Sequence, residues 1–119
     1  MNESAENLFD QITIVIVTFK SDKIIEKCIS NLDEKFKKVI VENSNNTELT
    51  KYLKTKYKNL ECINIGYDAG YGFALNRGIE VSRTRYVLCL NPDTFPEKNC
   101  IKLIYWTIKN YLDAAMVVP

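Results

Sequence analysis

The sequence predicts an α/β fold: a Rossmann-like, three-layer α/β/α arrangement built on a mostly parallel sheet. Three observations lead to this prediction. Short apolar runs rich in β-branched residues alternate with segments of helical periodicity. The first of these runs, ITIVIV, is apolar on both faces, which is typical of a parallel strand covered by helices. The connections are short, and repeated alternation of this kind favours right-handed crossovers with helices on both sides of the sheet.

The first half of the chain contains two strand–helix pairs. The run ITIVIV, Ile12–Val17, predicts a strand that is buried on both faces. Residues 21–32 follow with apolar side chains at helical spacing. The run KKVIVEN predicts a second strand that ends at Glu42, and residues 45–57 predict the helix after it.

The second half continues the alternation. Residues 60–65 and 85–91 predict the third and fourth strands, and residues 73–82 predict a helix between them. Residues 100–112 have the strongest helical apolar periodicity in the chain. Residues 114–118, AAMVV, then predict a fifth strand.

The composition is that of an ordinary globular protein. Hydrophobic residues make up 46% and charged residues 26% of 119 positions, which suits one domain or part of one. The net charge of +1 argues against a broad nucleic-acid surface. No apolar run approaches the roughly 18 residues of a membrane span. Residues 1–11 are polar and acidic, unlike a secretory signal, and predict an N-terminal extension to a domain at 12–119.

The chain has no histidine, which removes every Ser-His or Cys-His catalytic pair and any Cys/His zinc site. The four cysteines are widely spaced, without a Cys-x-x-Cys pair, and predict reduced thiols. A general base must therefore be a carboxylate, a lysine or a tyrosine.

Ligands of open parallel sheets bind beyond the carboxyl ends of the strands, near the switch in strand order. Polar residues gather at those ends in this sequence. They are Thr18-Phe19-Lys20, Glu42-Asn43-Ser44, Asn64-Ile65-Gly66 and Asn91-Pro92-Asp93.

All four glycines lie between Asn64 and Gly78, in NIGYDAGYGFALNRG. Glycine is needed where the backbone takes a positive φ or where something approaches it closely. The stretch is not a dinucleotide fingerprint, because its third position is Leu75 and it follows the third strand instead of the first. Two interpretations stand level: a tight strand-to-helix turn with close helix–sheet packing, and a turn that brings backbone close to a ligand.

The segment LCLNPDT places Asp93 directly after an apolar strand, with Pro92 stiffening the turn. A carboxylate there can hold Mg²⁺ or Mn²⁺ against a diphosphate, because such hard ions take oxygen ligands and share them with phosphate. The alternative, which the tetrapeptide alone favours, is that Asp93 or Thr94 caps the next helix. Thr94-x-x-Glu97 also resembles a capping box.

Other strand-end side chains have two interpretations each. Glu42 can accept a hydrogen bond from a nucleobase N–H, or it is a solvated loop acid, which is the stronger interpretation for this residue alone. Phe19 can stack on a base or, as a lone aromatic, belong to the core. Lys20 and Arg77 can meet phosphate charge, although a single one among 16 basic residues carries little weight.

Taken together, the motifs resemble those of the family 2 glycosyltransferases with the GT-A fold, and are most similar to the subgroup that includes rhamnosyltransferase-like enzymes. The resemblance runs from Ile12 to Pro119. Its most specific part is Asn64-x-Gly66-Tyr67 … Gly70-x-Gly72 … Asn76-Arg77-Gly78-Ile79, followed by the turn Asn91-Pro92-Asp93-Thr94.

The resemblance implies a nucleotide-sugar-binding subdomain at 12–119. Its ligand would be a UDP- or dTDP-sugar, held with Mg²⁺ or Mn²⁺ for inverting transfer to a hydroxyl of a glycan or lipid-linked acceptor. The implied donor-site residues are Thr18, Phe19, Glu42, Gly70, Gly72, Asn76, Asn91 and Asp93, with Asp93 as the metal ligand. The implied location is cytoplasmic, extending to a peripheral position at the inner face of the membrane.

Two departures from the family pattern qualify the implied activity. Leu75 stands where relatives usually carry Asn or Arg. Family members also extend well beyond the Asp-x-Asp region with an acceptor site and a general base, so this chain is expected to be truncated and inactive alone. The alternatives are a non-catalytic GT-A-like interaction module, self-associating through an apolar edge near Val117-Val118, and, more weakly, a nucleotidyltransferase.

Overall fold

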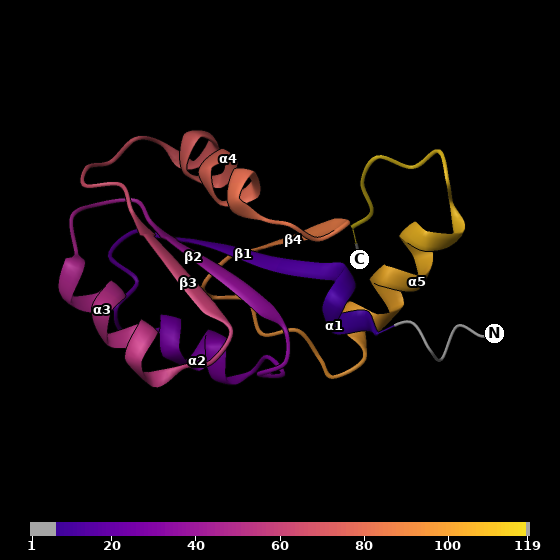
Figure 1. The fold of residues 1–119 in the computed structure, drawn as a ribbon, viewed down its shortest axis with the longest axis horizontal. Helices are drawn as coiled ribbons and strands as arrows, with labels where there is room; N and C mark the ends of the chain where they lie inside the picture. The colour runs from indigo at the N-terminus through magenta and orange to yellow at the C-terminus, as the bar shows by residue number, and fades with distance from the viewer. Residues whose placement is uncertain (1–6, 119) are drawn as a thin grey trace.

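A computed structural model describes residues 7–118 and has an α/β fold with one parallel sheet (Figure 1). The strand order is β3-β2-β1-β4, and every neighbouring pair is parallel. The strands are β1 (Ile12–Thr18), β2 (Lys37–Glu42), β3 (Leu60–Asn64) and β4 (Tyr86–Leu90). The helices are α1 (Leu8–Gln11), α2 (Ile25–Ser30), α3 (Thr47–Lys56), α4 (Tyr71–Val81) and α5 (Cys100–Asn110). The predicted fold class is confirmed.

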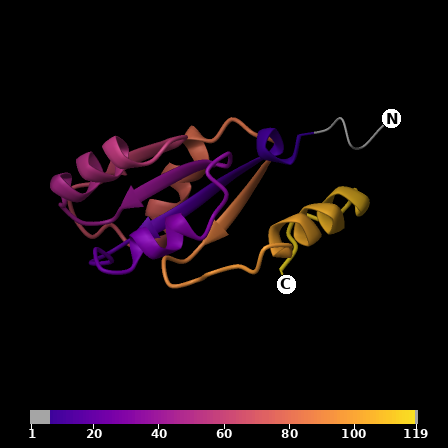
Figure 2. The ribbon, with the colours of Figure 1, turned by 90° about the horizontal axis from the view of Figure 1, so that it is seen from below.

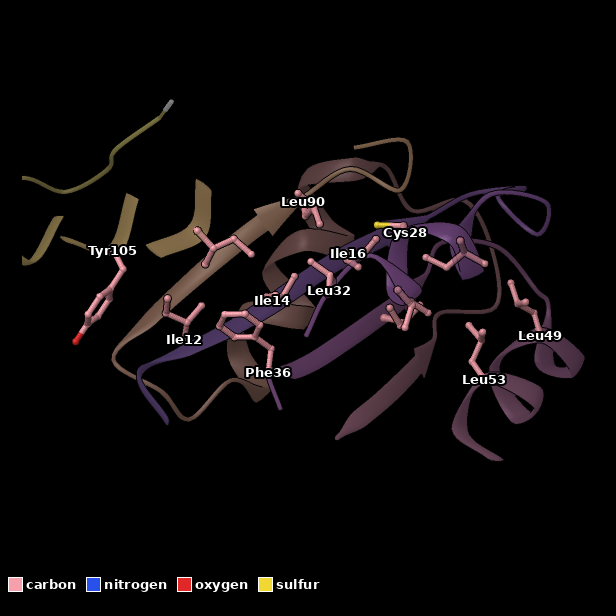
Figure 3. Close-up of a cluster of buried hydrophobic side chains, with 14 residues drawn as sticks. Ile12, Ile14, Ile16, Cys28, Leu32, Phe36, Leu49, Leu53, Leu90 and Tyr105 are labelled. Carbon is pink, nitrogen blue, oxygen red and sulfur yellow. The ribbon is translucent and has the colours of Figure 1, made fainter. Parts of the chain in front are cut away.

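The central strand β1 is buried along its whole length, and alternate side chains serve opposite faces of the sheet. Ile12, Ile14 and Ile16 join a cluster with side chains of α2, α3 and α5 (Figure 3). Val15 and Val17 join a second cluster that includes Ala74 of α4. Figure 1 shows α4 on one face of the sheet and α2 and α3 on the other, which gives the three layers.

The topology fixes where polar strand ends can meet. The chain adds β2 and β3 on one side of β1 and then returns to place β4 on its other side. The switch in strand order therefore lies between β1 and β4, and β2 is the neighbour of β1 on its other side. Thr18, Glu42 and Asn64 stand in one row across the sheet, because Thr18 pairs with Glu42 and Glu42 with Asn64.

The predicted N-terminal extension contains structure at its inner end. Residues 8–11 form α1, whose Asn7 cap accepts a hydrogen bond from the Phe9 N–H at 2.9 Å. Leu8 and Phe9 pack against the larger core cluster, and the Phe9 ring meets the Phe36 ring edge-on at 4.7 Å between centroids. Two apolar side chains in a polar segment are enough to anchor one helical turn. Residues 1–6 lie outside the described residues.

The predicted fifth strand is wrong for residues 114–118, which form no ladder with the sheet. Ala115 to Val118 instead line an apolar cavity with β4 and α5, and Figure 2 shows α5 and this segment beside β4. A short apolar run is compatible with a strand and also with an irregular segment that contacts the sheet only through its side chains. Pro119 lies outside the described residues.

A polar clamp joins α2 to α3. Glu26 accepts hydrogen bonds from Lys56 at 2.7 Å, from the Tyr57 hydroxyl at 2.7 Å and from the Tyr52 hydroxyl at 3.3 Å. The hydrogen bond from Lys56, followed by that from Tyr57, lowers the pKa of Glu26 below its ordinary value of 4.5. The charged carboxylate is thus favoured in the folded protein.

We predict that Glu26→Gln lowers the urea midpoint of unfolding at pH 7 and that its effect fades in acid. A carboxyl whose pKa is lower folded than unfolded stabilises fully above pH 4.5, and its contribution disappears as the pH falls through the folded pKa. Urea titrations at pH 7 and pH 3 measure this. Glu61→Gln, at an exposed position of β3, is the control. An equal loss for Glu26→Gln at both pH values would contradict the prediction.

Candidate functional site at the carboxyl ends of the strands

The centre of the candidate site is a buried carboxylate between two strand ends. The Glu42 side chain is 1% exposed, and Thr18 beside it is fully buried. The Thr18 hydroxyl donates to Glu42 Oε1 at 2.6 Å. The Ser44 hydroxyl donates to Glu42 Oε2. Both carboxylate oxygens therefore have hydroxyl partners, and the interpretation of Glu42 as a solvated loop acid is wrong.

The aromatic residue after β1 points out of the core. Phe19 is 44% exposed, so the core interpretation of this side chain is wrong. Lys20 follows with a positive φ of 53°, a sparsely populated conformation for a residue with a side chain. Its ammonium lies 5.3 Å from the Phe19 ring centroid. The end of β1 thus presents an aromatic face and a cation together.

The glycine segment uses its glycines in different ways. Gly66 and Gly70 have φ values of +97° and +88°, which favour glycine. Gly78 packs α4 onto the sheet, since a Cβ there would overlap the Val15 side chain and lie 3.0 Å from Val41 Cγ2. A Cβ at Gly72 would have no atom within 4 Å. The packing interpretation thus explains Gly78, whereas Gly72 and the exposed Asn76 leave space above the helix start.

A buried amide ties the glycine segment to the strand ends. Asn43, 4% exposed, accepts a hydrogen bond from the Ala69 N–H at 2.9 Å and donates to Asp68 Oδ1 at 3.4 Å. Asp68 Oδ1 also accepts from the Gly70 N–H at 3.1 Å. The Asn43 backbone N–H donates to the Thr18 carbonyl at 2.7 Å. One residue therefore links the ends of β1 and β2 to the turn before α4.

The turn after β4 leaves its carboxylate exposed. The Thr94 N–H donates to the Asn91 carbonyl at 3.0 Å. The Cys28 thiol lies beneath, 3.5 Å from the Thr94 carbonyl oxygen. Burial, and then the charge of Asp93, raises the pKa of Cys28 to about 11, so the thiol stays a donor at neutral pH. Asn91 and Asp93 are both exposed.

The capping interpretation of Asp93 is wrong. Helix α5 begins at Cys100, its N-cap is Asn99, and no side chain caps it. The predicted capping box at Thr94 and Glu97 lies in the loop before that helix. The three-residue spacing of a capping box is short and recurs by chance, and here a longer loop separates it from the helix. Asp93 is therefore free of a helix-capping role.

A hollow of about 320 Å³ lies beside this turn. Asn91 and Thr94 line one side and Tyr71, at the start of α4, lines another. Burial is the first cause that raises the pKa of the Tyr71 hydroxyl, which keeps it protonated. The hollow thus brings the β4 turn and the glycine segment together, although no hydrogen bond joins them within the described residues.

The side chains at the strand ends suit a metal ion that is bound jointly by the protein and a ligand phosphate, more than one bound by protein side chains alone. Within residues 7–118, no three acidic or cysteine side chains converge on one point. Asp93 offers one exposed carboxylate at the strand end. Magnesium-type ions are commonly held by one or two carboxylates together with substrate phosphates and water. This donor set fits that arrangement.

Several contributors were not assigned a role from the sequence. Asn43 and Ser44 follow β2 directly; the Asn43 side-chain bonds depend on how the segment of residues 64–70 folds back, whereas Ser44 bonds Glu42 two residues away. Asp68 and Tyr71 lie between the glycines of the segment, and no motif in the sequence marks either residue. The signal that finds Asn43 and Ser44 is their position directly after a buried parallel strand.

The sequence model of the family described as Glycosyl transferase family 2 matches residues 13–119. The chain belongs to glycosyltransferase family 2.

A curated hexosyltransferase is similar to this chain in sequence. The low-salt glycan biosynthesis hexosyltransferase Agl10 of Haloferax volcanii is 29% identical over 118 residues. That match covers 96% of this chain and 38% of the relative, so the chain spans well under half the length of the enzyme it matches.

A solved structure supports the fold. The crystal structure of S. aureus TarS 1-349 superposes with a TM-score of 0.69 at 16% identity. It covers 92% of this chain and 38% of that one. The fold of this family 2 chain is thus GT-A-like. Among the described residues, no helix combines the length and apolarity needed to cross a bilayer.

Proposed function

We propose that this family 2 chain binds the nucleoside-diphosphate sugar donor, a UDP- or dTDP-sugar, for inverting transfer to an acceptor hydroxyl. The observation that supports it best is the exposed carboxylate of Asp93. It follows β4, the strand beside the switch in strand order, and it does not cap α5. The glycine segment forms the opposite wall, where Gly72 and Asn76 leave room for a ligand. Nucleotide-sugar donors combine a base, a sugar and a diphosphate, which need an aromatic face, polar groups and a metal ion.

Asp93 would hold Mg²⁺ or Mn²⁺ together with the donor diphosphate. The ion would supply positive charge against the leaving nucleoside diphosphate. Asn91, on the same turn, would orient the diphosphate or the sugar by hydrogen bonding. The remaining positive charge nearest to the β1 end is Lys20, over the Phe19 ring.

Thr18, Phe19 and Glu42 would form the base pocket. The exposed Phe19 face suits stacking on a pyrimidine. Because both Glu42 oxygens already accept hydroxyl protons, Glu42 would shape the pocket chiefly by holding Thr18 and Ser44 in place. A hydroxyl whose proton is committed to a carboxylate keeps lone pairs free, so Ser44 could accept the imide N–H of uracil or thymine.

The test is calorimetry with UDP- and dTDP-sugars, with and without Mn²⁺, for the wild type and for Asp93→Ala. We expect metal-dependent binding by the wild type and at least about tenfold weaker binding by Asp93→Ala, because a charge-assisted contact is lost. Glu97→Ala, on the loop before α5, is the matched acidic control and should bind like the wild type. Binding that ignores both Mn²⁺ and the Asp93 substitution would overturn the metal assignment.

A non-catalytic interaction module is the second candidate function. It is favoured by exposed apolar side chains on α5 and the segment after it, with Leu103 65%, Leu112 90% and Met116 79% exposed. Faces of this kind commonly mark protein contacts. Light scattering that shows assembly, together with no nucleotide binding in the calorimetry, would favour this candidate over donor binding.

A further inference from the structure

Asn43 is the buried polar residue whose side chain joins the strand ends to the glycine segment. Its backbone N–H donates to the Thr18 carbonyl, and its side chain uses both ends of its amide on the glycine segment. The amide oxygen accepts from the Ala69 N–H, and the amide nitrogen donates to Asp68. Asn is suited to this position because one short side chain supplies an acceptor and a donor together.

The glycine segment has few other restraints between β3 and α4. Its start is held by the Ile65 N–H to the Glu42 carbonyl at 3.0 Å and by the Gly66 N–H to the Ser44 carbonyl at 2.9 Å. Beyond Gly66, Tyr67 is 60% exposed and does not anchor the segment in the core. Gly70, with a positive φ, then begins the turn into α4. The Asn43–Ala69 and Asp68–Gly70 bonds therefore fix where α4 begins.

We infer that Asn43 is a positioning residue: through Asp68 and Ala69 it locks the glycine segment in the conformation that binds the donor. The inference rests on the proposed function for its ligand, whereas the lock itself is a property of the free protein. Asn43 does not need to touch the nucleotide. It acts by setting the backbone of Gly70 and the orientation of Tyr71, which lines the hollow beside Asn91.

The sharpest variant is Asn43→Asp. It keeps the size of the side chain and the acceptor for the Ala69 N–H, but it replaces the amide donor with an oxygen that faces the Asp68 carboxylate. In the wild type these two atoms, Asn43 Nδ2 and Asp68 Oδ1, lie 3.4 Å apart. Two like charges at that separation, one on a buried residue and one on an exposed residue, repel each other and push the segment away.

Asp68→Asn is the matched variant. It keeps an oxygen that can accept from both the Gly70 N–H and the Asn43 amide, so alone it should change little. Combined with Asn43→Asp, it removes one of the two facing charges and should recover part of what the single variant loses. A variant that damaged the site only by disturbing the fold would not be repaired in this way.

The experiment measures amide hydrogen exchange at Ala69 and Gly70, and UDP affinity by calorimetry with Mn²⁺. For Asn43→Asp we expect exchange at Ala69 to rise and UDP binding to weaken, each by about tenfold or more, while amides of β1 and β2 keep their protection. Asp68→Asn should stay within about threefold of the wild type, and the double variant should lie between the two. If Asn43→Asp fails to fold, Asn43→Ala removes the same donor without adding charge and is measured in its place.

Unchanged exchange at Ala69 in Asn43→Asp would overturn the lock, and faster exchange with unchanged UDP affinity would overturn its role in positioning. A double variant no better than Asn43→Asp would also overturn it. Failure of the wild type to bind UDP or dTDP contradicts the proposed function itself, which is seen before any variant is compared, and exchange then still tests the lock.

Discussion

Replacing Gly78 by alanine is expected to destabilise the protein by about 1–3 kcal/mol. The added Cβ would overlap the Val15 side chain and approach Val41 Cγ2 at 3.0 Å. Both valines are β-branched, belong to the central strands and are buried, so neither can move aside. Alanine is a better helix former than glycine by about 1 kcal/mol, but overpacking against two fixed side chains outweighs that gain.

Gly72→Ala is the matched control, because it makes the same substitution in the same helix. A Cβ at Gly72 has no atom within 4 Å, so the helix-propensity gain is unopposed. We expect a change between zero and about 1 kcal/mol of stabilisation. Urea unfolding followed by circular dichroism measures both variants. Equal effects for the two would mean that α4 does not pack as closely on the sheet as described.

Thr18→Val is expected to lower stability by about 1.5–3 kcal/mol, the usual contribution of a hydrogen bond to a charged group. The substitution keeps the shape of the side chain and removes the hydroxyl that donates to Glu42 Oε1 at 2.6 Å. The Glu42 carboxylate would then be held by Ser44 alone, in a position where it is 1% exposed. A buried charge that loses a donor is costly because water cannot replace it.

Thr13→Val on the same strand separates this effect from the general loss of a threonine hydroxyl. Thr13 is 2% exposed, and its hydroxyl pairs with the neutral Thr84 hydroxyl at 2.7 Å. A neutral hydrogen bond contributes about 0.5–1.5 kcal/mol, so this variant should cost less than Thr18→Val. Chemical denaturation at neutral pH gives both values. A cost for Thr13→Val as large as that for Thr18→Val would mean that the Thr18–Glu42 hydrogen bond contributes no more than a neutral one.

The sheet could be predicted from sequence because its evidence is local. β1 and β2 are runs of β-branched side chains and β3 and β4 are short, mostly apolar segments, and their alternation with helical segments predicts the parallel order. The predicted fifth strand failed because apolar content alone does not determine pairing: β4 is an edge strand with an open side, yet residues 114–118 form no ladder with it. Residues 115–118 line a cavity with β4 and α5 but stay largely exposed, with Met116 79% and Val118 74% exposed.

The candidate site could be predicted in outline but not in its contacts. Strand-end positions identified Thr18, Glu42, Asn91 and Asp93, because carboxyl ends of parallel strands share one edge. The sequence could not show that Glu42 would be buried behind two hydroxyls, since that depends on the register between β1 and β2. It also could not show that Asn43 reaches Ala69, a contact between residues 26 positions apart.

Because β1 is buried on both faces, amino-acid substitutions are expected to be poorly tolerated in this strand and better tolerated in the loops that follow the strands. Every side chain of that strand is enclosed, so a substitution there disturbs the packing on one face of the sheet or on the other. The residues that follow the strands, such as Phe19 and Tyr67, are exposed and do not pack in the core. An engineer who wishes to alter ligand preference can therefore randomise these loop tips while leaving the strands intact, and should recover mostly folded variants.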